Sequence, residues 1–324
     1  RRSASADLPL AVGPVIRIAS NGSSRFFIMA FVATLIANPS NPVLGPALGE
    51  TAAQAVGASG LYWLADGIAC DIVLPQGADA KAAHKTLFST IAGLPIDIVI
   101  QDQDTRRKKI LIADMDSTMI GQECIDELAA EVGLKDKVSA ITARAMNGEI
   151  AFEPALRERV ALLKGLPVSV IDEVIEKRIT LTPGGKELVA TMRAKGYYTA
   201  LVSGGFTVFT TRVADMIGFQ ENRANILGEQ DGQLDGTVAE PILGKQAKVD
   251  ALIDIADTLG ISPDDALAVG DGANDLGMLH LAGSGVALHA KPAVAAEAKI
   301  RIDHGDLTAL LYLQGYRKSD FVTA

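Results

Sequence analysis

Three things are scarce in this 324-residue chain: cysteine, long apolar runs and positive charge. The two cysteines, Cys70 and Cys124, have no metal-ligand spacing, and reduced thiols in a cytoplasmic protein are favoured over a disulfide between them. No run of about 18 apolar residues occurs, so we expect no membrane span. Lysine and arginine number 30 against 39 aspartates and glutamates, a net charge of −9, which argues against a nucleic-acid-binding surface but permits a small anionic substrate.

Nucleotide-binding signatures are missing as well. Gly270 and Gly272 lack the third glycine of a dinucleotide fingerprint, and there is no Gly-x-x-x-x-Gly-Lys-[Ser/Thr] loop. The four histidines show no ligand spacing. What the chain does have is a hydrophobic content of 48%, enough for a sizeable core, and a length that suggests about two domains.

The N-terminal third divides into an extension and a small domain. Residues 1–28 are rich in serine, arginine and alanine, and we expect a poorly ordered extension there. Residues 29–104 show strand and helix patterns in the order βαββαβ, with Asp66-Gly67 as the turn of a hairpin. We expect strands at 31–37, 60–64, 68–74 and 96–100 and helices at 44–56 and 79–92.

That order is typical of a ferredoxin-like α+β unit. In length and topology it resembles the ACT family of small ligand-sensing domains, and we describe it as ACT-like. An amino-acid sensor and a structural or dimerising module fit this resemblance equally well, and the second would make the protein a homodimer.

A charged linker, Asp102–Lys109, marks the domain boundary, and the sequence of residues 105–324 predicts an α/β domain. Strand and helix patterns alternate from Pro183 onward, which favours a doubly wound, mostly parallel sheet. Four helical segments between the strands Ile110–Ala113 and Tyr198–Val202 predict a helical cap insertion at about 121–180. Residues 224–240, with two Asp-Gly pairs, predict a hairpin excursion.

Polar motifs follow three of the expected parallel strands, where ligands bind in such sheets. Each motif alone is as compatible with an ordinary strand end or turn, and a lone helix lysine is normally a solvated one. Their appearance in one order favours a single site. The motif residues are Asp114 and Asp116, then Ser203 and Gly204, then Lys248 on a helix, and finally Asp271, Asn274 and Asp275.

Together these motifs resemble the haloacid dehalogenase superfamily of phosphatases and, within it, the phosphoserine phosphatase family. The matching stretches are DMDSTMIGQECIDELA from Asp114, FEPALRERVALLKG from Phe152, VSGGF from Val202, Lys248, and VGDGANDLGML from Val269. The resemblance covers about two thirds of the chain. It implies a magnesium-dependent enzyme that hydrolyses O-phospho-L-serine through an aspartyl-phosphate, the last step of serine biosynthesis, with a haloacid dehalogenase-like core.

The resemblance implies a role for each catalytic position. Asp114 would be the nucleophile, Asp116 the general acid and base, and Lys248 the cation that neutralises developing charge. Magnesium suits hard oxygen ligands. Its expected ligands are Asp114, Asp116 through the backbone carbonyl, Asp271, and Asp275 directly or from a neighbouring position.

Substrate recognition is expected from the cap and the strand ends. Glu123 would pair with the ammonium group of phosphoserine and Arg159 with its carboxylate. Ser203 and the Gly204 amide would hold phosphoryl oxygens, and Asn274 would position the phosphoseryl group. Met146 and Phe152 would cover the ligand. Ordinary surface charges or cap core packing are the alternative interpretations of the cap residues.

Three other functions remain open at this point. A phosphotransferase would pass the phosphoryl group to a small alcohol such as homoserine. A sugar-phosphate or phosphoglycolate phosphatase would not need both Glu123 and Arg159. An amino-acid sensor with an inactive second domain is disfavoured because the catalytic set is intact.

Overall fold

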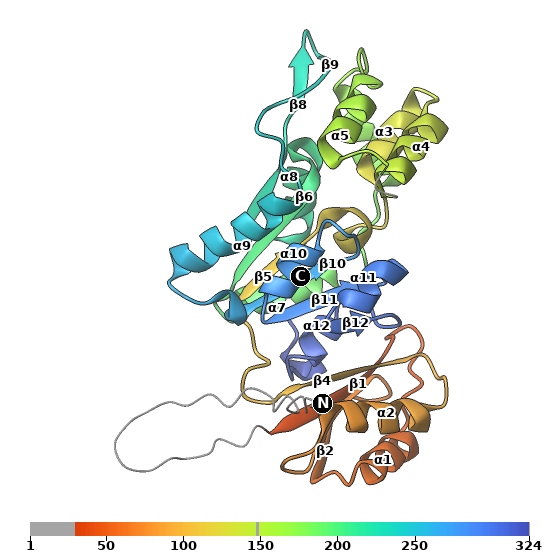
Figure 1. Cartoon of the computed structure of the whole chain (residues 1–324), viewed down its shortest axis with the longest axis vertical. Coiled ribbons are helices and arrows are strands. Elements are labelled where there is room, and N and C mark those ends of the chain that lie inside the picture. The colour runs from red at the N-terminus through yellow and green to blue at the C-terminus, as the bar shows by residue number, and fades with distance from the viewer. Residues whose placement is uncertain (1–29, 147–148, 324) are drawn as a thin grey trace, which may run out of the picture.

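The computed structural model describes residues 30–146 and 149–323. Figure 1 shows three parts stacked along the long axis: an N-terminal domain at the bottom, an α/β core in the middle and a helical cap at the top beside a projecting hairpin. The expected poorly ordered extension, residues 1–28, lies outside the described residues.

The N-terminal domain is an antiparallel sheet of four strands in the order β2-β3-β1-β4 with two helices. The predicted order of elements is confirmed, and the strand order is consistent with a ferredoxin-like fold. Apolar side chains of both helices, such as Ala52 and Leu87, cover one face of the sheet. The elements are β1 (Phe31–Ala37), α1 (Pro46–Ala55), β2 (Gly60–Ala65), β3 (Ala69–Val73), α2 (Ala80–Ile91) and β4 (Ile96–Asp102).

The opposite face of this sheet meets the core. Ile36 and Val99 pack into the apolar cluster of the rest of the chain. The Asp97 carboxylate accepts hydrogen bonds of 2.7–3.2 Å from the backbone N–H groups of residues 303–305. Burial raises the pKa of Asp97, while those three N–H groups lower it. The N-terminal domain is therefore docked on the core by both apolar and polar contacts.

The core is a parallel sheet of six strands in the order β12-β11-β10-β5-β6-β7, which confirms the predicted doubly wound sheet. Since β5 and β10 are neighbours but far apart in sequence, the winding direction reverses between them. Ligands bind at this switch point, outside the carboxyl ends of the strands. The strands are β5 (Ile110–Ala113), β6 (Tyr198–Phe206), β7 (Glu221–Asn225), β10 (Ala266–Gly270), β11 (Ser284–Leu288) and β12 (Ile300–Ile302).

Helices cover both faces of the sheet, as the apolar composition of its strands requires. Alternate residues of β5 belong to two apolar clusters: Ile110 and Ile112 pack with α9 and α10, and Leu111 and Ala113 with α7, α8 and α12. The helices are α7 (Gly185–Ala194), α8 (Thr207–Ile217), α9 (Lys245–Leu259), α10 (Leu276–Leu281), α11 (Pro292–Glu297) and α12 (Ala309–Tyr312), with short 3-10 turns η2 (Pro263–Asp265) and η3 (Lys318–Asp320).

The cap holds the four predicted helices: α3 (Cys124–Glu131), α4 (Lys135–Met146), α5 (Phe152–Ala161) and α6 (Ser169–Arg178). Two chain segments connect it to the core and run side by side. Gly121 N–H donates to the Thr180 carbonyl at 3.0 Å, and Thr182 N–H donates to the Met119 carbonyl at 3.0 Å. These backbone bonds make the two connections one short paired linker.

Several expectations change with the structure. Residues 221–225, too polar to predict a strand, form the edge strand β7, and the hairpin β8 (Leu227–Gln230) and β9 (Gln233–Val238) follows it. The turn after β5 is the π-helical η1 (Met115–Met119), and α11 was not predicted.

Cys70 and Cys124 are both free and buried, which confirms reduced thiols. Across residues 30–146 and 149–323, no helix has the length and apolar character needed to cross a bilayer.

Candidate active site

The predicted acidic residues meet at the switch point of the sheet. Asp114 directly follows β5, Asp271 follows the neighbouring β10, and Asp275 precedes α10. Carboxylate oxygens of the three residues lie within 4.8 Å of one another, and all three side chains are buried. The sequence order therefore becomes one cluster because parallel strands end at the same edge.

Asp114 is held from two directions. Its Oδ1 accepts a hydrogen bond from Met115 N–H at 2.8 Å and lies 2.6 Å from Lys248 Nζ. Burial raises the pKa of Asp114 well above its ordinary value, Asp275 adds to the rise, and Lys248 opposes it. The carboxylate is dry and oriented, as an attacking group must be.

Lys248 is 1% exposed, so it is not a solvated helix lysine. It projects from α9, and its Nζ lies 2.6 Å from both Asp114 Oδ1 and Asp275 Oδ1. Burial alone would lower the pKa of Lys248, but the two carboxylates raise it above its ordinary value. The lysine is a fixed positive charge beside the Asp114 carboxylate.

Asp116 lies in the π-helical turn η1 beside the cap linker. Its Oδ1 accepts a hydrogen bond from Cys124 N–H at 3.2 Å. Burial, followed by the neighbouring Glu123 carboxylate, raises the pKa of Asp116 to about 7. A carboxyl group that titrates near neutral pH can donate a proton in one step and accept one in the next.

Asp271 contacts two residues to which the sequence analysis gave no role. Thr118 Oγ1 donates to its Oδ1 at 3.3 Å, and Lys291 Nζ lies 3.9 Å from its Oδ2. Burial, followed by Asp275, raises the pKa of Asp271 to about 6. Gly270 makes this loop possible: a Cβ there would lie 2.3 Å from Asp275 Cγ.

The donor set fits a divalent cation. Three buried carboxyl groups, Asp114, Asp271 and Asp275, lie together beside Lys248, and the half-buried Asp116 is close enough to raise the pKa of Asp114, so negative charge exceeds positive charge among these residues. Burial is the largest cause of the raised pKa values of Asp116 and Asp271, and the neighbouring carboxylates of Glu123 and Asp275, respectively, add to the rise. All the available donors are oxygen atoms, which suit hard cations.

Ser203 and Gly204 lie inside β6, which runs four residues beyond its predicted end at Val202, at a point where its pairing with β7 is irregular. We call residues 203–205 the Ser203 segment, and this segment lies against Asp116. Ser203 is 2% exposed, and its Oγ accepts from Gly205 N–H at 2.9 Å. A Cβ on Gly205 would lie 3.0 Å from Asp116 Oδ2, which shows how closely the two motifs approach. Asn225, which sequence reasoning missed, donates to the Gly204 carbonyl at 2.8 Å and accepts from Leu243 N–H at 2.7 Å. Asn225 therefore fixes the Ser203 segment from the neighbouring strand β7.

The cap brings further predicted residues to this edge. A Cβ on Gly204 would lie 3.3 Å from Phe152 Cζ, so the Phe152 ring covers the Ser203 segment. The Glu123 carboxylate accepts from Ser117 Oγ at 2.8 Å. Asn274 is half-buried after Asp271. Met146 is the last residue of α4, and its side chain lies outside the described part of the structure.

Arg159 is 8% exposed and belongs to the same region. It donates to the Ala155 carbonyl at 3.2 Å and to Thr142 Oγ1 at 3.1 Å. Burial lowers the pKa of Arg159, while Asp126, Glu123 and Asp116 oppose that change. A desolvated guanidinium and several carboxylates therefore share the space between cap and core, so Arg159 is no ordinary surface charge.

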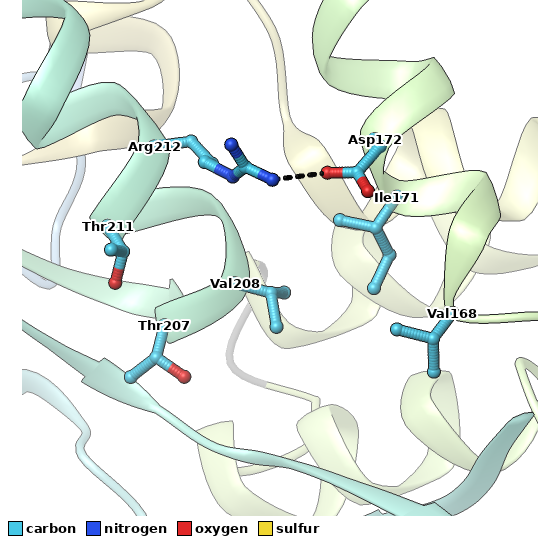
Figure 2. A pocket seen from close by; sticks show the side chains of 7 residues that line it. All are labelled: Val168, Ile171, Asp172, Thr207, Val208, Thr211 and Arg212. Atoms are coloured by element: carbon cyan, nitrogen blue, oxygen red, sulfur yellow. Dashed lines mark hydrogen bonds and ion pairs between the residues drawn. The ribbon is translucent and has the colours of Figure 1, made fainter. Parts of the chain in front are cut away.

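A cavity of about 400 Å³ also lies between cap and core, but it is separate from this cluster. Figure 2 shows it between α6 and α8, with Arg212 reaching across to Asp172. That ion pair measures 2.9 Å, and both side chains are well exposed, so it contributes little stability. The lining residues are Val168, Ile171, Asp172, Thr207, Val208, Thr211 and Arg212, none of them a predicted site residue.

Comparisons with known proteins agree with this geometry. The family model of haloacid dehalogenase-like hydrolases matches residues 111–280. A phosphoserine phosphatase of Archaeoglobus fulgidus is 44% identical over 234 residues, covering 72% of this chain and 68% of the relative.

Solved structures extend the likeness. A haloacid dehalogenase family hydrolase of Salmonella enterica serovar Typhi superposes with a TM-score of 0.78 at 30% identity, covering 88% of this chain and 98% of that one. A phosphoserine phosphatase carrying a phospho-aspartyl intermediate analogue superposes with a TM-score of 0.60 at 41% identity, covering 64% and 98%. Residues 105–324 alone are too few to supply the larger coverage, so the N-terminal domain takes part in that match.

Both the matched family and the relatives are enzymes, and the acidic cluster lies within the matched residues. The chain belongs to the phosphoserine phosphatase family of the haloacid dehalogenase-like hydrolases.

Proposed function

We propose that this enzyme hydrolyses O-phospho-L-serine to serine and phosphate with Mg²⁺ as its cofactor, and that Asp114 is the nucleophile. The observation that carries the proposal is the buried Lys248 ammonium, 2.6 Å from the Asp114 carboxylate, beside a second carboxyl whose pKa is about 7. A nucleophile, a fixed cation and a general acid are the groups that phosphoryl transfer through an acyl phosphate needs.

The reaction divides into two displacements. Asp114 attacks phosphorus as the bond to the seryl oxygen breaks, and protonated Asp116 gives its proton to that oxygen. Asp116, now a base, takes a proton from water, which attacks the aspartyl-phosphate and restores the Asp114 carboxylate. Mg²⁺, held by Asp114, Asp116, Asp271 and Asp275, would supply positive charge that lets an anionic nucleophile meet an anionic substrate.

The surrounding groups orient the phosphate. Ser203 Oγ and the Gly204 N–H would bind phosphoryl oxygens, since the glycine lets the backbone approach closely. Lys248 would stabilise charge in both transition states. Asn274 would hold the phosphoseryl group from the α10 side.

Substrate choice would come from the cap. Glu123 would accept from the substrate ammonium, and Arg159 would bind its carboxylate through paired N–H groups. Phe152, which contacts the Ser203 segment, would exclude water once the ligand is bound, and Met146 would help to cover the ligand. A phosphatase for uncharged sugar phosphates would have no use for both charged groups.

Phosphate release from a set of monoesters tests the proposal. With Mg²⁺, we expect phosphoserine to be hydrolysed with a kcat/KM at least about 100-fold above sugar phosphates, which lack both the ammonium and the carboxylate group, and about 10-fold or more above phosphoglycolate, which lacks the ammonium group. Phosphothreonine has both groups, so only its additional methyl group distinguishes it from phosphoserine. EDTA should abolish activity. Comparable rates on a sugar phosphate would contradict the assignment. Phosphorylation of added homoserine in place of phosphate release would indicate the phosphotransferase alternative.

The role of the N-terminal domain stays a prediction. An ACT-like sensor would bind an amino acid, and a dimerising module would pair two chains. Light scattering of the full chain with and without serine separates these possibilities, because a sensor changes with ligand and a constitutive dimer does not.

A further inference from the structure

Ser117 has a backbone conformation that residues other than glycine seldom adopt. Its φ is 55° and its ψ is 6°, in the left-handed region. It lies inside the π-helical turn η1, directly after Asp116. A left-handed serine is unfavourable, and such residues gather at functional sites, so the contacts that this conformation creates need a reason.

The conformation turns Ser117 back toward the cap. Its N–H donates to the Gln122 carbonyl at 3.2 Å, and its Oγ donates to Glu123 Oε1 at 2.8 Å. Gln122 belongs to the paired linker, and Glu123 is the residue that precedes α3. A hydroxyl of the core thus fixes a carboxylate of the cap.

Glu123 has like charges on one side and the Arg159 guanidinium on another, so a fixed contact decides where its carboxylate lies. Its charge raises the pKa of Asp116 and, more weakly, that of Asp271, so it faces the acidic cluster. A glutamate has three side-chain torsions and would otherwise turn away from these carboxylates. Although Glu123 occupies the N-cap position of α3, its side chain makes no capping hydrogen bond, so helix stability does not explain its placement.

We propose that Ser117 is a specificity-determining positioning residue: its hydroxyl holds the Glu123 carboxylate where it binds the substrate ammonium. This inference rests on the proposed function. The hydrogen bond uses Oε1, and a carboxylate has further acceptor sites on both oxygens, so Glu123 can still accept from an ammonium group. The unfavourable backbone of Ser117 is retained because it places the hydroxyl at this point.

The test compares kcat/KM for O-phospho-L-serine with that for 3-phosphohydroxypropanoate, the same molecule without its amino group. The variants are Ser117→Ala, Ser117→Gly, Glu123→Gln and the double variant Ser117→Ala/Glu123→Gln. Ser117→Gly adopts a positive φ without strain and lacks only the hydroxyl, so it separates the hydrogen bond from the backbone. Ser89→Ala is the control, because its Oγ contacts only the Lys85 carbonyl on the N-terminal domain. Thermal melting checks that each variant is folded.

We expect both Ser117 variants to lower the preference for phosphoserine about 10-fold, mainly through a higher KM for phosphoserine, as for a lost charge-assisted contact. Adding Ser117→Ala to Glu123→Gln should lower the preference no further, since the two residues act together. Ser89→Ala should match the wild type.

Other outcomes overturn the inference. The inference fails if both Ser117 variants keep the wild-type preference, or if kcat/KM falls equally for the two substrates. It also fails if the preference is reduced in Ser117→Ala but not in Ser117→Gly. If Glu123→Gln also keeps the wild-type preference, recognition of the ammonium by Glu123 fails too. If Glu123→Gln loses the preference and Ser117 variants keep it, only the role of Ser117 fails.

Discussion

Replacing Asp271 by asparagine should change the stability of the metal-free protein in a way that depends on pH. Burial, then Asp275, raises the pKa of this carboxyl from 3.8 to about 6. Asparagine has the same size and can still accept from Thr118 Oγ1, but it carries no charge at any pH. The variant therefore removes the cost of ionising a buried group and keeps the hydrogen bond.

Proton linkage determines whether the stability that Asp271 contributes rises or falls with pH. The folded chain binds the Asp271 proton more tightly than the unfolded chain, so this group contributes stability below pH 3.8 that is lost as the pH rises through about 6. The difference in pKa corresponds to roughly 3 kcal/mol at pH 8, or about 5–10 °C in melting temperature for a domain of this size. Without metal, Asp271→Asn should melt above the wild type at pH 8, by about half as much at pH 5, and near it only below pH 3.8.

Magnesium should reverse the order at pH 8. A cation that binds only the folded chain stabilises it by an amount that grows with the logarithm of its concentration divided by its Kd, and Asp271 is one of its proposed ligands. Melting curves by circular dichroism, from pH 3.5 to 8 in EDTA and at pH 8 in Mg²⁺, measure both effects. Asp257→Asn, at an exposed position on α9, is the matched control and should show neither. A constant difference between wild type and Asp271→Asn across this pH range in EDTA, or equal stabilisation of both by Mg²⁺, would refute the reasoning.

Three further substitutions follow from the geometry. Lys248→Met should lower kcat by roughly 100-fold or more and destabilise the metal-free fold by about 3–5 kcal/mol, because two buried carboxylates lose their cation; unchanged denaturant unfolding would contradict this. Arg159→Ala should reduce kcat/KM for phosphoserine by about 10–100-fold and leave that for an aryl phosphate nearly unchanged; equal losses would remove Arg159 from substrate recognition. Gly270→Ala places a Cβ 2.3 Å from Asp275 Cγ and should lower the free energy of unfolding by about 1–3 kcal/mol, as measured by denaturant unfolding. Gly45→Ala, whose Cβ would have no atom within 4 Å, should lower it less.

Much of the fold could be predicted because its elements carry strong local patterns. The strands Phe31–Ala37 and Ile110–Ala113 have the bounds that their apolar patterns indicated. The edge strand Glu221–Asn225 was missed because its sequence, ENRAN, is polar, and it forms by pairing with β6. Local pattern does not encode such pairing.

The site was predictable where it depends on strand ends. Asp114 and Asp271 come together because β5 and β10 finish at one edge of the sheet, so order along the chain was enough. Ser203 lies inside β6, which is longer than predicted. Thr118 and Lys291 were not predicted because their contacts with Asp271 join residues distant in sequence. Ser117 escaped notice because its role depends on a left-handed φ that a serine does not suggest.

Trapping of the covalent intermediate tests the proposed mechanism most directly. Enzyme turning over phosphoserine with Mg²⁺ is quenched in acid, and the phosphorylated peptide is identified by mass spectrometry. We expect an acyl phosphate on Asp114, absent from a folded Asp114→Asn variant that releases no phosphate. The mechanism would be contradicted if the wild type released phosphate without any phosphorylated aspartate, or if the phosphoryl group were found on another residue.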